Sequence, residues 1–154
     1  MHAPRRPDSR RRYGVDMKKD YLVSTSAEKI DRERVHYWLS ELSYWARGRT
    51  REAQDAAIDA SRNYGVFDTT TGEQAAYGRV ITDGVTFAWL CDVFVAPDAR
   101  GRGLGKMLAA AVVDDLEPLG LKRIMLSTGD AHGLYAQFGF APLADPTRVM
   151  ERVR

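Results

Sequence analysis

The sequence has few of the residues that form disulfides or hold metal ions. Cys91 is the single cysteine among 154 residues, so an intramolecular disulfide is excluded and no thiol pair is available for a zinc site. The three histidines, His2, His36 and His132, lie far apart in the sequence. We therefore expect no metal site in this protein.

Long apolar runs are also missing. No apolar segment approaches the roughly 20 residues that span a bilayer, and the basic N-terminus lacks the apolar core of a secretory signal. We therefore expect a cytoplasmic protein that does not enter a membrane. A chain of 154 residues, of which 44% are hydrophobic and 29% charged, is typical of a single globular domain with a buried core.

Charge is distributed unevenly along the chain. Residues 1–19 carry seven basic and two acidic side chains, whereas residues 20–154 carry sixteen basic and nineteen acidic ones. A basic, apolar-poor segment is typical of a disordered leader or of an arm that binds nucleic acid. We favour a disordered leader over 1–19 and one domain over 20–154, because the body is acidic and has no nucleic-acid recognition motif. Met17 also resembles an alternative translation start.

Within 20–154 the hydrophobic pattern alternates between strand and helix periods. We expect strands at 21–23, 64–68, 74–82, 86–95, 124–126 and 149–153. We expect helices at 31–42, 51–62, 104–116 and 131–138. The order is a strand, two helices, a three-stranded meander, a helix, a strand, a short helix and a closing strand, which predicts a mixed α/β domain around one sheet. The continuous apolar run 124–126 is typical of a buried strand.

A glycine-rich segment, 100–106, connects the strand at 86–95 to the helix at 104–116. Gly101, Gly103 and Gly105 stand at alternate positions, so the backbone can turn its N–H groups toward an anion. The start of the helix adds unpaired N–H donors and the positive end of its dipole. This arrangement predicts a cradle for a diphosphate. The alternate spacing of the glycines differs from G-x-G-x-x-G. The segment is also not a P-loop, because Met107 stands where Ser or Thr would hold magnesium.

Two segments together resemble one known family. Residues 92–106 (DVFVAPDARGRGLGK) contain R-x-x-G-x-G after an apolar strand, and residues 131–140 (AHGLYAQFGF) match A-x-x-x-Y-x-x-x-G-F. Both segments, and the order of elements from Tyr21 onward, resemble the GNAT family of N-acetyltransferases. The resemblance implies the GNAT fold and the transfer of an acetyl group from acetyl-CoA to a primary amine by direct attack in a ternary complex. The acceptor would be a small molecule or a protein.

The resemblance also implies where the cofactor binds. Backbone groups of Phe94 and Val95 would pair with pantetheine, and a bulge there would aim an N–H at the thioester oxygen. The diphosphate would rest on N–H groups from Arg100 to Gly105. Thr128 stands where many relatives have an asparagine. The implied cofactor-binding residues are Phe94, Val95, Arg100, Gly101, Arg102, Gly103, Leu104, Gly105, Lys106, Thr128 and Tyr135.

The resemblance implies a general acid and leaves the identity of the general base open. Tyr135 corresponds to the general acid that protonates the leaving thiolate. Asp92 is either the general base or a structural carboxylate. Polyamine-type relatives carry the favoured base one position earlier, where this chain has Cys91. His132 is a further candidate for the base.

The acceptor does not follow from the sequence. Arg47, Arg49 and Arg51 favour an acceptor with a carboxylate or phosphate, whereas Asp92 favours a cation. An alternative function is that of a coenzyme A-binding sensor without a competent base. Either a monomer or a homodimer is compatible with the sequence.

Overall fold

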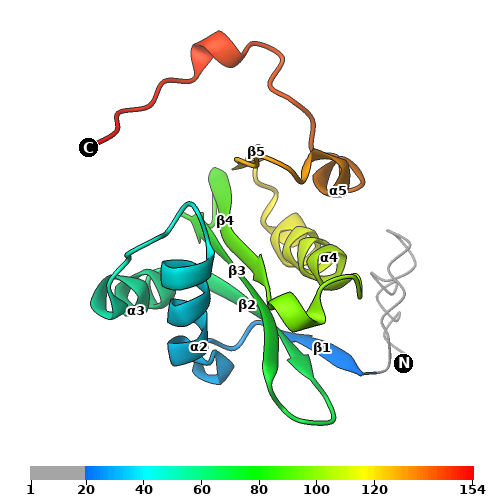
Figure 1. Ribbon diagram of the computed structural model, residues 1–154. Helices are drawn as coiled ribbons and strands as arrows, with labels where there is room; N and C mark the ends of the chain where they lie inside the picture. The colour runs from blue at the N-terminus through cyan, green and yellow to red at the C-terminus, as the bar shows by residue number, and fades with distance from the viewer. Residues whose placement is uncertain (1–19) are drawn as a thin grey trace, which may run out of the picture.

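The computed structural model describes residues 20–154, so the predicted leader at 1–19 lies outside the described residues. Five strands form one sheet in the order β1-β2-β3-β4-β5 (Figure 1). Strands β1 to β4 are antiparallel to their neighbours, and β5 runs parallel to β4. The strands are β1 (Tyr21–Ser24), β2 (Arg62–Asp68), β3 (Gln74–Thr82), β4 (Phe87–Val95) and β5 (Arg123–Leu126). The predicted mixed α/β fold is confirmed.

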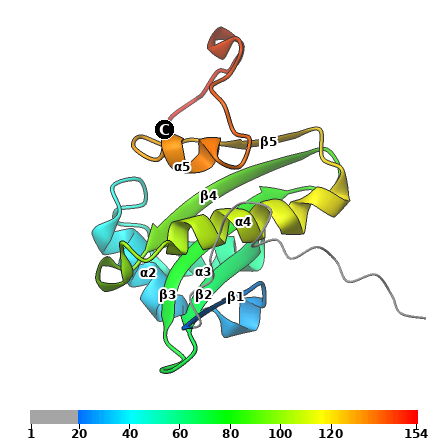
Figure 2. The same cartoon turned by 90° about the vertical axis from the view of Figure 1, so that its right-hand side faces the viewer.

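Helices cover both faces of the sheet, as Figures 1 and 2 show together: α2 and α3 lie on one face and α4 on the other. A π-helical turn, η2 (Trp38–Leu42), continues α2. The α-helices are α2 (Arg32–Tyr37), α3 (Arg51–Asp59), α4 (Leu104–Leu116) and α5 (His132–Ala136). The short 3₁₀ turns are η1 (Ala27–Lys29), η3 (Pro97–Ala99), η4 (Glu117–Leu119) and η5 (Pro146–Arg148). Within residues 20–154, no helix is long and apolar enough to cross a membrane.

Side-chain caps start helices α2 and α3. The Asp31 carboxylate accepts a hydrogen bond from the backbone N–H of Arg34, and the Thr50 hydroxyl accepts one from that of Ala53. Each cap satisfies one of the N–H groups that a first turn leaves unpaired. The helices therefore begin close to the positions that the sequence predicts.

The core lies between the sheet and its helices. The predicted apolar stripe of α4 is buried against the sheet: Leu104, Leu108, Val112 and Leu116 each expose 2% or less of their surface. On the other face, Trp38 stacks on Phe94 of β4 with ring centroids 5.7 Å apart. Both faces of β4 are thus held by packing, which fixes the strand that carries the candidate site.

Two predictions about the C-terminal part of the chain are wrong. Residues 149–153 form no strand, and the segment 141–154 contains only the short turn η5. It leaves α5 and runs away from the sheet (Figures 1 and 2). In addition, β5 is not buried: Arg123 is exposed and the other three residues are half-buried. The physical reason is the same for both, because each lacks a neighbouring strand: β5 pairs with β4 on one side only, and residues 149–153 pair with no strand.

Candidate active site

The unpaired edge of β4 beyond the end of β5, called the opening below, forms the centre of the candidate site. The two strands pair from Phe87 opposite Arg123 to Leu90 opposite Leu126. Beyond Leu90, β4 continues to Val95, but the structure shows no further pairing with β5. The pairing stops there because β5 itself ends at Leu126, so residues 91–95 of β4 have no strand on that side in the part of the chain that the structure describes.

A β-bulge lies in β4 just beyond its last pair with β5. On β3, Tyr77 and Arg79 are two residues apart, whereas their partners Phe94 and Cys91 are three apart, so β4 contains one extra residue. Asp92 has φ 54°, and it is the single non-glycine residue with positive φ in the part of the chain that the structure describes. Aspartate tolerates this left-handed conformation better than most residues. The expected bulge is present, two residues before Phe94.

The bulge decides which side chains face which layer. Leu90 and Val93 both line a narrow pocket under α4, although a regular strand would place residues three apart on opposite faces. Asp92 and Phe94 consequently point to the other layer, toward η2 and the loop at 43–50. The pocket under α4 also has Gly105 and Tyr135 in its lining. The glycine-rich segment and the predicted general acid thus meet beside β4.

The glycine-rich segment has the backbone that the sequence predicts. Gly101 and Gly103 have φ 78° and 77°, in the left-handed region that favours glycine. Gly103 is the N-cap of α4, so the N–H groups of its first turn have no partner within the helix. A helix of 13 residues also places the positive end of its dipole here. The segment can therefore hold a diphosphate.

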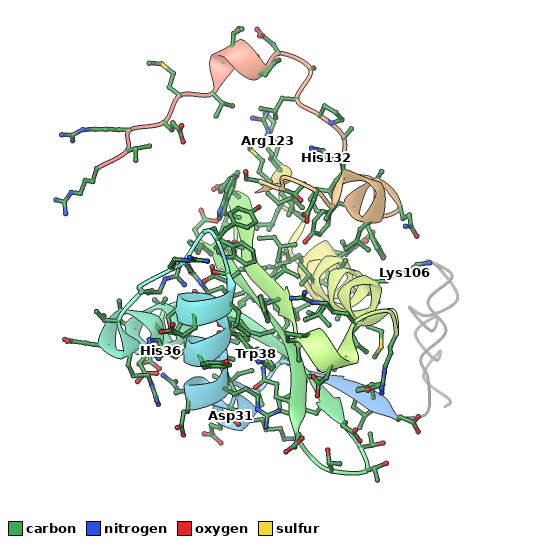
Figure 3. All side chains as sticks on the ribbon, in the orientation of Figure 1. Asp31, His36, Trp38, Lys106, Arg123 and His132 are labelled. Carbon is green, nitrogen blue, oxygen red and sulfur yellow. The ribbon has the colours of Figure 1, made fainter. Side chains whose placement is uncertain are left out.

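The basic side chains of this segment take different directions. Arg102 donates a hydrogen bond to the Tyr21 hydroxyl at 2.7 Å, which ties the segment to β1. Arg100 turns back onto β4, where it donates to the Val95 carbonyl at 3.2 Å and lies 5.3 Å from the centre of the Phe94 ring. Lys106 projects outward from the first turn of α4 (Figure 3). The three side chains do not converge on one point.

Tyr135 lies on α5 and is 7% exposed. Its ring packs edge-on against Phe140, with centroids 5.9 Å apart. Burial raises the pKa of the phenol to about 12, and the charge of Asp130 acts in the same direction. The hydroxyl is therefore fully protonated at neutral pH, as a general acid must be.

Asp92 is held by three donors from two different elements. Its carboxylate accepts hydrogen bonds from Arg49 and Arg79, each at 2.6 Å, and from the Trp45 indole at 3.0 Å. The side chain is 2% exposed. Burial alone would raise the pKa of this carboxyl, but the hydrogen bonds from the two arginines outweigh it and hold the pKa below its usual value. Of the two roles predicted for Asp92, these contacts favour the structural one.

The loop at 43–50 reaches across the opening. Trp45 lies against Phe94 with centroids 6.4 Å apart, and Tyr44 packs edge-on against Trp45 at 5.0 Å. The Tyr44 hydroxyl lies so close to Gly129, in the loop after β5, that a Cβ there would be 3.3 Å from it. Tyr44 and Trp45 are 71% and 43% exposed. They form an aromatic surface between β4 and the loop that follows β5.

The three arginines expected together on the acceptor side are not brought together. Arg51 pairs with Asp55 on the outer surface of α3, at 3.1 Å. Arg47 is exposed. Arg49 alone lies at the bulge, where it meets Arg79, a strand residue that the sequence analysis missed. The signal for Arg79 was a charged residue inside an otherwise apolar strand, which has to find a buried partner.

The remaining candidates have other surroundings. The Thr128 hydroxyl accepts hydrogen bonds from the backbone of Asp130 and Ala131, at 3.4 and 3.0 Å, so it orders the turn before α5. Burial raises the pKa of the Cys91 thiol to about 11, which makes it a poor base and a poor nucleophile. His132 is exposed at the start of α5 (Figure 3). Among residues 20–154 there is no cluster of three His, Cys, Asp or Glu that fits a metal ion.

Comparison with known proteins agrees with this geometry. A protein of Xanthomonas campestris pv. campestris, assigned to the GNAT acetyltransferases, has a crystal structure that superposes with a TM-score of 0.82 at 43% identity, covering 87% of this chain and 93% of that one. The Gibberella zeae protein named as acetyltransferase FG08082 is 29% identical over 136 residues, 77% of each chain. Rice serotonin N-acetyltransferase 2 is 35% identical over 83 residues, which are 53% of this chain and 42% of that protein.

The model of the Acetyltransferase (GNAT) family matches residues 31–140. This range contains β4 and β5, the bulge, the glycine-rich segment and Tyr135. The match spans most of the chain. The chain belongs to the GNAT family of acetyltransferases.

Proposed function

We propose that this protein transfers an acetyl group from acetyl-CoA to a primary amine. The observation that carries the proposal is the unpaired edge of β4 beyond β5, together with the anion cradle at the start of α4 and the neighbouring pocket lined by Gly105 and the buried Tyr135. The amine nitrogen attacks the thioester carbonyl, the N–C bond forms, the C–S bond breaks and coenzyme A leaves as a thiolate. The transfer is direct, because the Cys91 thiol is too weakly acidic to act as an acetyl carrier.

Each part of the cofactor has a matching group on this chain. The diphosphate rests on backbone N–H groups from Gly101 to Gly105, with added positive charge from Arg102. Pantetheine occupies the opening and pairs with the backbone of Phe94 and Val95. Since Arg100 donates to the Val95 carbonyl, pantetheine has to share or displace that hydrogen bond. The bulge at Asp92 turns a backbone N–H toward the thioester oxygen, where it stabilises the developing oxyanion.

Tyr135 protonates the leaving thiolate in this scheme. An ordinary thiol has a pKa of about 8.5, so a phenol with a pKa of about 12 is a weak acid by comparison. The thiolate, however, forms in the same apolar pocket, and desolvation raises its pKa as well. Burial raises the pKa of both the phenol and the thiol, so the proton transfer between them remains feasible.

Asp92 acts as a positioning residue in this proposal. Its carboxylate fixes Arg49 and Trp45, both from the loop at 43–50, against the bulge of β4. A carboxylate with a lowered pKa and two arginine donors is a poor proton acceptor. The amine therefore enters in its neutral form or loses its proton to water.

The charge at the bulge points to the class of acceptor. Arg49 and Arg79 share the single carboxylate of Asp92, so the cluster carries one excess positive charge. The Arg49 side chain is 23% exposed, next to the aromatic surface of Tyr44 and Trp45. Asp92 does not attract a cationic substrate, because its charge is already balanced. We propose an acceptor amine that also bears a carboxylate or phosphate, which Arg49 contacts.

A second candidate is an aromatic amine without an anionic group. The exposed rings of Tyr44 and Trp45 favour it, and the name of the rice relative states serotonin as that enzyme's substrate. A third, the coenzyme A-binding sensor, is favoured by the involvement of Asp92 in ion pairs, which leaves no evident base at the bulge. Turnover measured with matched pairs of acceptor amines distinguishes these three candidate functions.

The acceptor class is tested with amines that differ only in a carboxylate, such as tryptophan and tryptamine, while free thiol release from acetyl-CoA is followed. We expect a higher kcat/KM for the carboxylate-bearing member of each pair. Arg49→Gln should lower that value about 10- to 100-fold, since a charge-assisted hydrogen bond contributes roughly 1.5–3 kcal/mol, and should change the other member little. Equal rates for both members would favour the aromatic amine, and no turnover with any amine would favour the sensor.

Tyr135→Phe tests the general acid. The variant keeps the ring and its contact with Phe140, so coenzyme A affinity and thermal stability should change little. We expect kcat to fall by roughly 10²–10⁴-fold, because the proton transfer occurs in the transition state. The matched control is Tyr44→Phe, which removes an exposed hydroxyl on the other side of the opening. A normal kcat for Tyr135→Phe, with chemistry shown to be rate-limiting, would reduce Tyr135 to packing.

Asp92→Asn separates positioning from general base catalysis. The folded-state pKa of Asp92 is lowered, so its ion pairs stabilise the protein above the unfolded pKa of about 3.9 and lose this effect as the pH falls through the folded value. The wild type should therefore have the higher melting temperature at pH 7, with the difference disappearing in acid. The rising limb of the pH–rate profile should stay where it is. Loss of that limb would identify Asp92 as the base.

A further inference from the structure

A buried glutamine on α3 contacts the Arg49 side chain. Gln54 is fully buried, and its amide oxygen accepts a hydrogen bond from Nη1 of Arg49 at 3.0 Å. The same Nη1 atom donates to the carboxylate of Asp92 at 2.6 Å. The Arg49 guanidinium therefore has two acceptors inside the protein, a neutral amide on α3 and a carboxylate on β4.

The amide nitrogen of Gln54 takes no part in this contact. Within residues 20–154, two buried side-chain atoms lack a hydrogen-bond partner, and they are Nε2 of Gln54 and Oγ of Ser40. A buried donor without a partner is destabilising. A glutamate at position 54 would accept from Arg49 in the same way and would leave no donor unpaired. What glutamine provides here, and glutamate would not, is a neutral side chain.

A neutral residue at position 54 decides the charge of the cluster at the bulge. Arg49 and Arg79 have one carboxylate between them, that of Asp92. Arg79 also donates to the Ser61 hydroxyl at 3.2 Å, and its side chain is 12% exposed, compared with 23% for Arg49. The excess positive charge therefore meets solvent mainly at Arg49. A carboxylate at position 54 would cancel it.

Arg49 also retains hydrogen-bond donors for a ligand. A guanidinium has five N–H groups, and within the described chain Arg49 uses three of them, two on Asp92 and one on Gln54. Two donors are left. The backbone of Arg49 is fixed as well, because Nε2 of His36 donates to its carbonyl at 2.8 Å. An anchored guanidinium with two remaining donors can contact a carboxylate or a phosphate.

We propose that Gln54 determines the acceptor specificity of this protein: it holds Arg49 without neutralising it, so that an anionic group on the acceptor amine supplies the missing negative charge. This inference rests on the proposed transfer to an anion-bearing amine, and it names the residue that sets the preference. Gln54 is a positioning residue, because it is fully buried and acts on the acceptor through Arg49.

The test replaces the amide by a carboxylate of the same size. Gln54→Glu adds one negative charge and removes no hydrogen bond, since Nε2 has no partner within the described residues. We expect the ratio of kcat/KM for tryptophan to that for tryptamine to fall about 10- to 100-fold, through the KM for tryptophan, because a charge-assisted hydrogen bond is lost. Gln54→Met, which is also neutral, should keep the preference for tryptophan.

A double variant shows whether Gln54 acts through Arg49. Arg49→Gln removes the guanidinium that Gln54 contacts. In that background, Gln54→Glu should leave the ratio for the two amines unchanged, because both substitutions remove one and the same contact. A further fall in the ratio would show that position 54 affects the acceptor by another route and would overturn the proposal.

Melting temperatures test the charge of the cluster without turnover. The matched control is Gln74, which is 2% exposed but whose amide nitrogen donates to the Ala76 carbonyl at 3.0 Å. Gln74→Glu replaces this donor by an anion that faces a carbonyl, whereas Gln54→Glu gains an ion pair with Arg49. We therefore expect Gln54→Glu to have the higher melting temperature of the two at pH 7. An equal or lower value would overturn the proposal.

The results for wild type and Gln54→Glu distinguish this inference from the proposed function. Equal rates for every matched pair of amines in the wild type, or no turnover with any amine, would contradict the anion-bearing acceptor, and the role of Gln54 would fall with it. A wild type that prefers tryptophan, together with a folded Gln54→Glu variant that has the same preference, would leave the acceptor class standing and overturn the role of Gln54.

Discussion

The β-bulge at Asp92 is the constraint on which the candidate site depends. An extra residue in β4 breaks the alternation of the strand, so that Val93 stays under α4 while Asp92 and Phe94 face η2 and the loop at 43–50. The left-handed backbone of Asp92 is stabilised by the carboxylate's bonds to Arg49, Arg79 and Trp45. The bulge lies just beyond the last pair of β4 with β5, so this one irregularity orders the loop beside the unpaired edge of β4.

This arrangement places opposite electrostatic conditions on the two sides of β4. On the α4 side, Tyr135 lies in an apolar pocket that raises its pKa to about 12. On the other side, the Asp92 cluster is ionised and carries an excess positive charge. A phenol kept protonated on one side and a cationic contact on the other suit a reaction in which a thiolate leaves and an anion-bearing amine enters. The assignment of substrate class in our proposal depends on this asymmetry.

Local patterns predicted most of the fold and the cofactor segment. Helix α4 and the turns at Gly101 and Gly103 depend on residues that are close in the sequence. Their structure could therefore be predicted from the apolar spacing and the glycines alone. The role of Asp92 was not decided in this way, because its partner Arg79 lies on another strand and Arg49 on a distant loop. Arg47, Arg49 and Arg51 form a cluster in the sequence that favours an anionic acceptor, yet only Arg49 reaches the bulge.

The two wrong predictions, a buried β5 and a closing strand at 149–153, have a common cause. Both rested on apolar sequence that suits a strand with neighbours on each side, and within one chain those neighbours are not provided.

The account is tested most directly by calorimetric titration of coenzyme A into the wild type and two glycine variants. Gly103→Glu places a carboxylate against the diphosphate at the start of α4. Gly72→Glu introduces the same side chain at the same φ of 77°, in the distant turn between β2 and β3. We predict that the wild type and Gly72→Glu bind coenzyme A with roughly micromolar affinity and that Gly103→Glu does not bind it. Equal binding by Gly103→Glu, or binding of NAD or ATP in place of coenzyme A, would contradict the account.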